Sequence, residues 1–327
     1  MPSSASAPLK SSACRVAFGG SAACASREDP PALRVALERL AGDDQETLVA
    51  AAGAATTRNE VWLFPGHDLS GGFGLARPGL ALEAATTDLY ERLFAATEGL
   101  HLYRLWNYVP HINASDDGLE NYHRFCQARS LAFEARLGRH FRQLLPSSSA
   151  VGASAGPLAV AFVAGTAPAR HFENPSQVPA FNYPSEHGPR PPSFSRATRA
   201  DTSAATHVFI SGTAAIRGHA TVAPGDLDAQ VTCTLENLRS IGQACGAGTA
   251  LGGNGEWARA FKIYLRRRED LAHVVKRIEG DLLRPGDRVM YLCADICRSE
   301  LVFEIEARFA STKPHLDNGR HRLAPRP

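Results

Sequence analysis

The most regular alternation of hydrophobic and polar side chains lies near the carboxyl end of the chain, between Leu301 and Phe309. Every second residue there is apolar, and the positions between them include Glu304 and Glu306. A period of two is typical of a strand that buries one face. The two carboxylates then share the other face, about 6.5–7 Å apart along the strand. Outward polar residues of this kind are usually only hydrated, so the pattern alone leaves a hydrated acid and a catalytic acid as alternatives.

Other apolar runs predict further strands, and segments with an apolar repeat of three to four residues predict helices. Strands are expected at residues 15–20, 61–65, 100–113, 158–163, 207–212, 261–265 and 289–292. Helices are expected at residues 31–41, 86–98, 116–137, 226–244 and 269–280. The Ser-, Ala- and Gly-rich segment 146–156 is the candidate linker. The long irregular segment 168–192, dense in proline, is typical of a functional loop.

The order of these elements indicates an internal repeat. VWLFPG, a helix and LYRLWNYV in the first half are similar to HVFISG, a helix and AFKIYLR in the second half. Strand, helix and strand thus recur at a similar spacing, which predicts an α/β (α+β) fold of two packed sheet-plus-helix units. We place the boundary at the candidate linker, with a first domain at residues 1–150 and a second domain, which contains Glu304, at residues 151–327.

The composition narrows the class of protein. The chain has 327 residues, of which 44% are hydrophobic and 21% are charged, and its net charge of +2 gives no basic footprint for nucleic acid. Seven cysteines without regular spacing do not indicate a disulfide framework, and Cys293 and Cys297 lack a second pair that would complete a zinc site. No apolar run approaches a signal-peptide core or a membrane span. We therefore expect a cytoplasmic protein of enzyme size, with neither nucleic acid nor membrane as a partner.

Two sets of motifs resemble known families. FISG at 209–212, TLENL at 234–238 and VFEIEA at 302–307 are similar to the YjgF/RidA superfamily, whose fold is like that of the barrel-like chorismate mutases. LWNYVPHIN at 105–113, GPRPPSFSRA at 188–197, SGTAAIRGH at 211–219 and ADICRSELVFEIEA at 294–307 resemble the chorismatases. Four motifs in the correct order are more specific than any one of them, and the resemblance runs from about residue 60 to about residue 310.

The resemblance implies an enzyme that releases pyruvate from chorismate and needs neither a metal nor an organic cofactor. One subtype hydrolyses chorismate to a dihydroxycyclohexadiene acid, and a second forms 3-hydroxybenzoate. A third forms both 3- and 4-hydroxybenzoate for xanthomonadin-type pigment and ubiquinone synthesis, and the overall resemblance favours this subtype. Because RidA-like units form trimers, a homotrimer and a monomer that buries the same surfaces within itself are both open.

The resemblance also implies roles for individual residues. Glu304 matches the family's catalytic acid, which protonates the methylene carbon of the enolpyruvyl group. Cys297, the second catalytic candidate, and Gly212, a substrate-binding candidate, match positions that are alanine in the hydrolysing subtype, so together they favour hydroxybenzoate formation. The other substrate-binding candidates offer cationic or hydrogen-bonding side chains for the two carboxylates and the ring hydroxyl, and they are Arg196, Arg190, Tyr183, Asn107, Tyr108 and Arg170.

Several of these residues could have a structural role instead of a catalytic or binding one, and the whole chain could have a different function. Cysteine is often a small buried hydrophobe, glycine often ends a strand in a turn, and Tyr108 has a core-packing alternative. The competing functions are the hydrolase subtype, a RidA-like imine deaminase, and a non-catalytic protein that binds a small carboxylate. The products formed from chorismate distinguish these functions.

Overall fold

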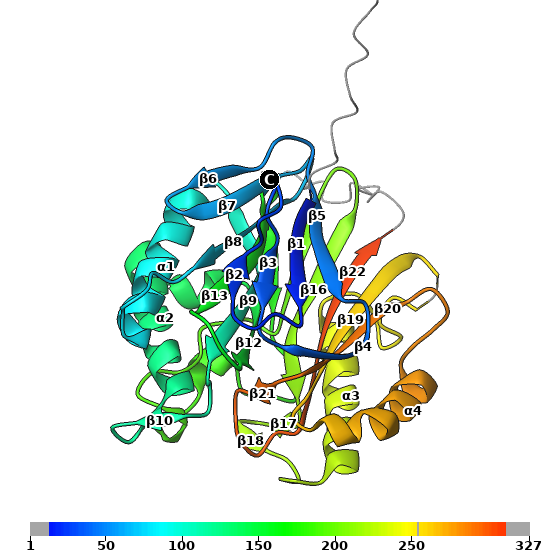
Figure 1. The fold of residues 1–327 in the computed structure, drawn as a ribbon. Coiled ribbons are helices and arrows are strands. Elements are labelled where there is room, and N and C mark those ends of the chain that lie inside the picture. The colour runs from blue at the N-terminus through cyan, green and yellow to red at the C-terminus, as the bar shows by residue number, and fades with distance from the viewer. Residues whose placement is uncertain (1–12, 254, 312–327) are drawn as a thin grey trace, which may run out of the picture.

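The computed structural model describes residues 13–253 and 255–311. Two large sheets form the body of the molecule, and each carries two helices on its outer face (Figure 1). The strands of the first sheet are β6 (Thr56–Arg58), β7 (Val61–Pro65), β8 (Ser70–Leu75), β9 (His101–Pro110), β12 (Ser147–Ala153), β13 (Ala159–Gly165) and β21 (Asp295–Ile296). Their order is β21-β12-β9-β13-β8-β7-β6.

Helices α1 (Leu82–Ala96) and α2 (Asn121–Leu137) cover the first sheet. Their buried residues, such as Leu89 and Phe133, belong to one apolar cluster with Leu105 and Phe162 of the strands. The helix α2 begins later than the predicted residue 116. Asp117 and Gly118 both have positive φ, so these residues form the turn of a hairpin between β10 (Ser115–Asp116) and β11 (Leu119–Glu120).

The second sheet contains the strand with the two carboxylates at its centre. Its strands are β4 (Glu38–Gly42), β14 (Ala169–Phe172), β15 (Ala197–Asp201), β16 (Thr206–Ala214), β19 (Trp257–Leu265), β20 (Arg288–Cys293) and β22 (Phe303–Ser311). Their order is β14-β15-β16-β22-β19-β20-β4. The helices α3 (Leu227–Ala244) and α4 (Leu271–Asp281) cover the outer face, where Phe303 and Ile305 of β22 are buried. The predicted α+β class with two sheet-plus-helix units is therefore confirmed.

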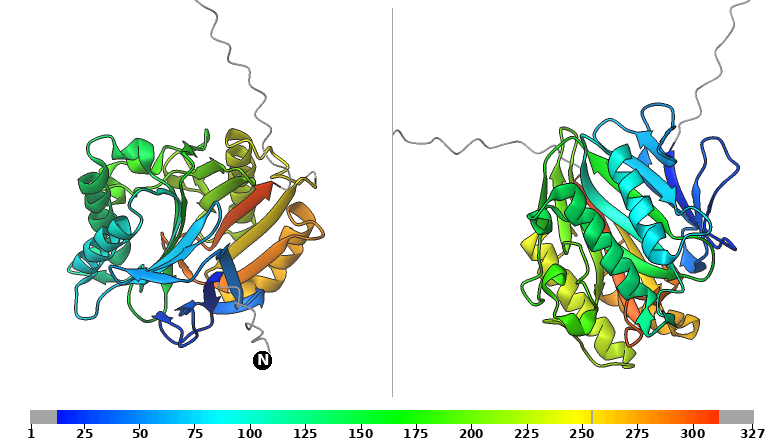
Figure 2. Two further views of the ribbon diagram at one scale, coloured as in Figure 1. Left: turned by 90° about the horizontal axis from the view of Figure 1, so that it is seen from above. Right: turned by 90° about the vertical axis from the view of Figure 1, so that its left-hand side faces the viewer.

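A third sheet near the amino end lies beside the inner faces of the two large sheets. It consists of β1 (Ala13–Phe18), β2 (Cys24–Ala25), β3 (Leu33–Val35) and β5 (Gln45–Ala50) in the order β2-β3-β1-β5. Figure 2 shows these strands at the side where the two large sheets diverge. Val16 and Leu48 of this sheet share one apolar core with Tyr108 and Phe209 of the large sheets. The inner faces are thus covered within one chain.

The predicted helix at residues 31–41 is wrong. This segment forms β3, which pairs with β1, and β4, which pairs with β20 at the edge of the second sheet. Its residues alternate between buried and exposed in β3, which suits an extended chain. Pairing with strands distant in the sequence outweighs the local helix propensity.

The predicted linker at residues 146–156 is also wrong, because it contains the buried strand β12. Its small residues permit a close approach between the two large sheets. Ser147 donates its hydroxyl to the carbonyl of Tyr103, and the Ser148 amide donates to the Ser211 hydroxyl across the interface. A composition rich in serine, alanine and glycine here reflects tight packing.

The expected domains do not coincide with separate sheets. The first sheet includes β13, and the second sheet includes β4. The division into residues 1–150 and 151–327 stays a prediction. No helix in the described ranges is long and apolar enough to span a membrane.

Candidate active site

A cleft of about 420 Å³ gathers segments that are far apart in the sequence. The loop 183–196, strand β16, the hairpin of β17 (Ile216–Arg217) and β18 (Ala220–Thr221), and the segment 297–304 line it. A small inner recess between α2 and β12 continues it. Among the residues predicted for the site, those lining the cleft are Tyr183, Arg196, Gly212, Cys297 and Glu304.

Glu304 lies on β22 with its side chain directed away from the helix-covered face, as the alternation predicts, and it is 4% exposed. Burial and the neighbouring Glu306 raise the pKa of Glu304 to about 8, although Arg104 and Arg196 act in the opposite direction. Within the described residues, no hydrogen bond to its carboxyl group is formed. Glu304 is therefore a neutral acid at neutral pH, next to the open space of the cleft.

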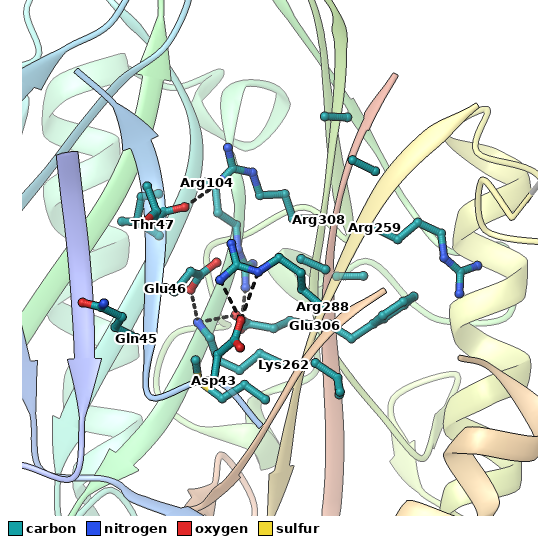
Figure 3. A pocket seen from close by; sticks show the side chains of 18 of the residues that line it. Asp43, Gln45, Glu46, Thr47, Arg104, Arg259, Lys262, Arg288, Glu306 and Arg308 are labelled. Carbon is teal, nitrogen blue, oxygen red and sulfur yellow. Dashed lines mark hydrogen bonds and ion pairs between the residues drawn. The ribbon is translucent and has the colours of Figure 1, made fainter. Parts of the chain in front are cut away.

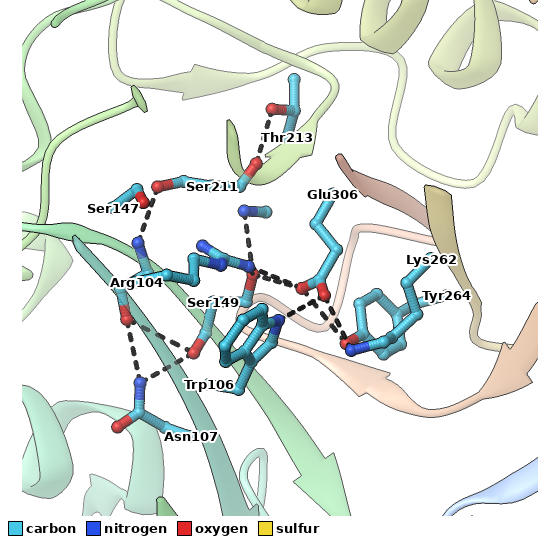
Figure 4. Close-up of polar contacts among 12 residues, drawn as sticks. Arg104, Trp106, Asn107, Ser147, Ser149, Ser211, Thr213, Lys262, Tyr264 and Glu306 are labelled. Carbon is cyan, nitrogen blue, oxygen red and sulfur yellow. Dashed lines mark hydrogen bonds and ion pairs between the residues drawn. The ribbon is translucent and has the colours of Figure 1, made fainter. Parts of the chain in front are cut away.

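Glu306, two residues further along the same face, is held in the opposite protonation state. Burial acts to raise the pKa of Glu306, but Lys262 and Arg104 lower it to about 2. Figure 4 shows the side chains that surround it. The polar atoms nearest to its oxygens are Trp106 Nε1 at 2.5 Å, Ser149 Oγ at 2.6 Å, Arg104 Nη2 at 2.7 Å, Lys262 Nζ at 2.9 Å and Tyr264 OH at 3.2 Å.

The two carboxyl groups thus have different chemical properties. Glu306 is an anion in a network of hydrogen bonds, and Glu304 is a protonated carboxyl group at the edge of that network. Environments that separate the pKa values of two neighbouring acids are typical of acid–base catalysis. This outcome favours the catalytic alternative for Glu304 over a hydrated strand face.

Gly212 links this network to the acid. Its amide donates to Ser149 Oγ at 2.9 Å, and the same hydroxyl donates to Glu306. A Cβ atom at position 212 would lie 2.2 Å from Oε1 of Glu304 and 3.1 Å from Ser149 Oγ. Since β16 continues to Ala214, Gly212 does not end the strand in a turn. The absence of a side chain at this position leaves room for the carboxyl group of Glu304.

Cys297 borders both the cleft and the inner recess. Burial and the nearby Glu304 raise the pKa of its thiol to about 12, against the opposing effect of Arg298. The thiol therefore stays protonated at neutral pH and is no nucleophilic thiolate. Its place beside the acid suits a small neutral group that shapes the cleft.

Two arginines in the cleft are available to an anionic ligand. Arg196, 5% exposed, donates from Nη2 to the hydroxyl of Tyr183 at 2.7 Å, and its Nε is buried without a partner. Arg298 lies over the ring of Tyr183 at 5.3 Å and donates to the carbonyl of His219. In the part of the chain that the structure describes, neither guanidinium forms an ion pair. Because an uncompensated buried charge is costly, a bound carboxylate would stabilise above all the buried Arg196, while Arg298 is half-buried.

Arg298 was missing from the predicted binding residues, although it directly follows Cys297 in a motif of the sequence. The structure does not bring Arg190 and Arg170 into the cleft. Arg190 pairs with Glu134 at 2.6 Å, and Arg170 pairs with Asp201 at 2.8 Å. Both arginines already have carboxylate partners outside the cleft lining.

Asn107 and Tyr108 also lie outside the lining of the cleft, on β9. Asn107 accepts a hydrogen bond from Tyr90 at 2.5 Å and donates to the carbonyl of Ser149 at 2.8 Å. Tyr108 is buried in the core, with its ring 6.2 Å from that of Phe18. Asn107 thus positions β12, and the position of Tyr108 agrees with the core-packing alternative.

A second cavity, of about 310 Å³, lies between β5 and the strands β19, β20 and β22 (Figure 3). Two of its cations have carboxylate partners, since Lys262 lies 2.6 Å from Glu46 and 2.9 Å from Glu306, and Arg288 lies 2.6 Å from Asp43. A third, Arg308, donates to the carbonyl of Thr47 at 3.2 Å. Glu304 does not line it. The first cleft therefore fits an acid-catalysed reaction of an anionic substrate better.

The sequence and the fold of the chain are similar to those of known chorismatases. The family model of the N-terminal part of FkbO/Hyg5-like chorismatases matches residues 39–164. A 3-hydroxybenzoate synthase of Streptomyces hygroscopicus is 37% identical over 235 residues, which cover 68% of each chain. A chorismatase of the same species is 35% identical over 268 residues, which cover 79% of this chain and 74% of the relative.

The crystal structure of a chorismatase has the same fold, with a TM-score of 0.79 and 28% identity. The match covers 93% of this chain and 96% of that structure. The sequence relatives are at least 35% identical over more than two thirds of this chain and of their own length, and the crystal structure shares the fold. The chain belongs to the chorismatase family.

Proposed function

We propose that this chorismatase converts chorismate to 3-hydroxybenzoate and 4-hydroxybenzoate and releases pyruvate, with Glu304 as the general acid. The observation that carries the proposal is a neutral buried carboxyl group in a cleft with two arginines that form no ion pair with any described residue. Chorismate has two carboxylates and an acid-sensitive enolpyruvyl ether. Its charges and its reactive group therefore match those of the cleft.

The reaction begins with proton transfer from Glu304 to the methylene carbon of the enolpyruvyl group, which leaves a cation stabilised by the ether oxygen. The ring hydroxyl oxygen then attacks the neighbouring ring carbon while the bond from that carbon to the ether oxygen breaks, so pyruvate leaves without attack by water. The resulting three-membered ring opens, its oxygen regains the hydroxyl proton, and loss of one ring proton makes the ring aromatic. That proton restores the carboxyl group of Glu304. Hydroxybenzoate and pyruvate together contain all atoms of chorismate, so the reaction needs no oxidant.

Arg196 and Arg298 bind the substrate carboxylates in this proposal, and their guanidinium groups lie 5.8 Å and 5.3 Å from the centre of the Tyr183 ring. The tyrosine hydroxyl accepts the hydrogen bond that orients Arg196. The ionised Glu306 keeps the proton on Glu304, since a second negative charge nearby disfavours ionisation. In this proposal Arg196 and Arg298 therefore bind the anionic substrate, whereas Glu306 keeps Glu304 protonated.

The product assignment rests on Gly212 and Cys297 together with the sequence resemblance. The relative described as a 3-hydroxybenzoate synthase supports the first product. We also propose that the enzyme forms 4-hydroxybenzoate and supplies xanthomonadin-type pigment and ubiquinone synthesis. This part of the proposal rests on the overall sequence resemblance. The cytoplasmic location and the choice between a monomer and a homotrimer stay predictions.

Product analysis tests the proposed function directly. Purified protein is incubated with chorismate, and liquid chromatography should show pyruvate in equal amount to the sum of 3- and 4-hydroxybenzoate. 3-Hydroxybenzoate alone would assign the enzyme to the second subtype. A non-aromatic dihydrodiol would contradict hydroxybenzoate formation, and unchanged chorismate would contradict the reaction itself.

Replacing Gly212 with alanine should lower turnover by about 10²-fold, because a displaced catalytic group costs about that much. The added methyl group would overlap Oε1 of Glu304, at 2.2 Å, and force the acid away from its position. Since the hydrolysing subtype has alanine here, the products should also shift towards the dihydrodiol. Both quantities follow from the same chromatographic assay.

Gly280→Ala on α4 is the matched control, because a Cβ atom there lies more than 4 Å from the other described parts of the chain. Its turnover and products should equal those of the wild type. If Gly212→Ala has the same turnover and products as this control, the proposal that position 212 determines the placement of Glu304 is wrong.

A further inference from the structure

Three potential metal ligands meet at the mouth of the cleft, and the proposed reaction uses none of them. Glu186 and His187 belong to the 3₁₀ turn Ser185–His187, and His219 lies in the β17–β18 hairpin. We propose that these three side chains form a binding site for a divalent transition metal ion of the zinc type. The ion would join two segments that line the cleft.

The three ligand atoms form a nearly equilateral triangle. Nε2 of His187 lies 3.0 Å from Nδ1 of His219, and Oε1 of Glu186 lies 3.4 Å and 3.3 Å from these nitrogens. Ligand atoms around tetrahedral zinc, at about 2.0–2.1 Å from the metal, are about 3.3–3.4 Å apart. A point at bonding distance from all three atoms therefore exists just outside their plane.

Protons alone do not satisfy these three contacts when both rings are neutral. A neutral imidazole nitrogen either donates or accepts, and a carboxylate only accepts. If one of the two nitrogens carries a proton, the lone pair of the other faces the carboxylate of Glu186. If both carry protons, two N–H groups face each other across 3.0 Å. One cation bound by three lone pairs removes both conflicts.

Contacts with the rest of the chain restrain the backbone at His219 and the ring of His187 independently of any ion. The residue before His219, Gly218, has its amide and carbonyl bonded to the backbone of Ser176 and Val178, and Arg298 donates to the carbonyl of His219 at 2.9 Å. The rings of His187 and Tyr183 lie 5.3 Å apart. Preorganised ligands reduce the ordering cost of metal binding.

Three protein ligands leave at least one coordination position for water or for a substrate oxygen. The positive charge of Arg298 nearby opposes a dication, so we expect binding weaker than at a closed structural zinc site. The ion is not required for the proposed acid catalysis, and its binding is measured without substrate. The result is therefore independent of the proposed function.

Titration of the full chain with Zn²⁺ by calorimetry, and with Co²⁺ by visible absorption, tests the site. A Cys24→Ser background removes an exposed thiol that binds the same ions. We expect one ion per chain and the d–d bands of a four- or five-coordinate Co²⁺ ion. Glu186→Gln, His187→Ala and His219→Ala should each weaken binding by at least about 10-fold, since loss of an outer partner alone costs that much.

The matched control is His273→Ala, which removes an exposed histidine paired with Asp228 at 2.7 Å. This variant should bind both ions like its parent. Circular dichroism establishes that every variant is folded. Equal binding by the parent and by the His187→Ala/His219→Ala double variant, or no Co²⁺ bands in the parent, would overturn the proposal.

Discussion

Glu304→Gln should lower the turnover of chorismate by about 10²–10⁴-fold, the usual loss when a general acid is removed. Glutamine keeps the size of the side chain and can both donate and accept hydrogen bonds, but its amide has no proton acidic enough to be transferred. Because the pKa of Glu304 is raised to about 8, wild-type kcat/KM should be constant below this pH and fall as pH rises through it. A continuous pyruvate assay over this range measures both effects.

The same substitution should stabilise the fold at neutral pH. Glu304 is ionised in the unfolded chain, where its pKa is near 4.5, and protonated in the folded chain. Folding at pH 7 therefore takes up a proton, at a cost of up to about 3 kcal/mol. Glutamine removes this cost. The gain in the free energy of unfolding should disappear as pH falls to the unfolded pKa, because the carboxyl group is then protonated in both states.

Urea unfolding of the wild type and of Glu304→Gln at pH 7 and near pH 4.5 measures the gain in the free energy of unfolding at each pH. Glu91→Gln on the exposed face of α1 is the control for a carboxylate in water. Turnover in Glu304→Gln close to that of the wild type would refute the role of the acid. Lost turnover without a gain in stability at pH 7 would instead refute the raised pKa.

Glu306→Gln should have the largest effect on stability, a loss of about 3–5 kcal/mol in the free energy of unfolding. Lys262 and Arg104 are both buried, and the substitution leaves them without this ionised partner. Because the charge of Glu306 raises the pKa of Glu304, the pH above which activity falls should also move to lower values. Urea unfolding and the pH profile of kcat/KM measure the two effects.

A second substitution separates these effects from a general loss of packing. Adding Lys262→Met to Glu306→Gln removes one of the two buried cations that have lost Glu306 as a partner, and it should recover part of the lost stability. The double variant should keep the shifted pH profile, since the charge at position 306 is still absent. A pH profile that is unchanged in both variants would show that Glu306 does not control the protonation of Glu304.

Most of the strands and helices were predictable from the sequence because local periodicity records which face is buried. The alternation around Glu304 predicted β22 within two residues at either end, and it placed both carboxylates on the face opposite the helices. Asp226, predicted to begin a helix, accepts a hydrogen bond from the Ala229 amide at the start of α3. The strand alternation and the helix cap both depend on residues that are close to each other in the sequence.

The errors arose where distant segments determine the local structure. Residues 31–41 are strands because they pair with β1 and β20, and neither partner is visible from local pattern. The serines of β12 were mistaken for a linker because tight packing and flexibility favour the same small residues. Arg190 and Arg196, six residues apart, have similar sequence surroundings, and only the fold provides Arg190 with the partner Glu134.

The sequence by itself determined the fold class, the family and the strand that carries the acid. These properties depend on residue order and on spacing along the chain. Only the tertiary structure decided which of two carboxyl groups on one face keeps its proton. Glu306 is ionised because Arg104, 202 residues away, and Lys262 on the adjacent strand converge on it, whereas Glu304 lies beside the open cleft. A pKa follows from charges and burial in space, and these depend on contacts that form only when the sheets pack together.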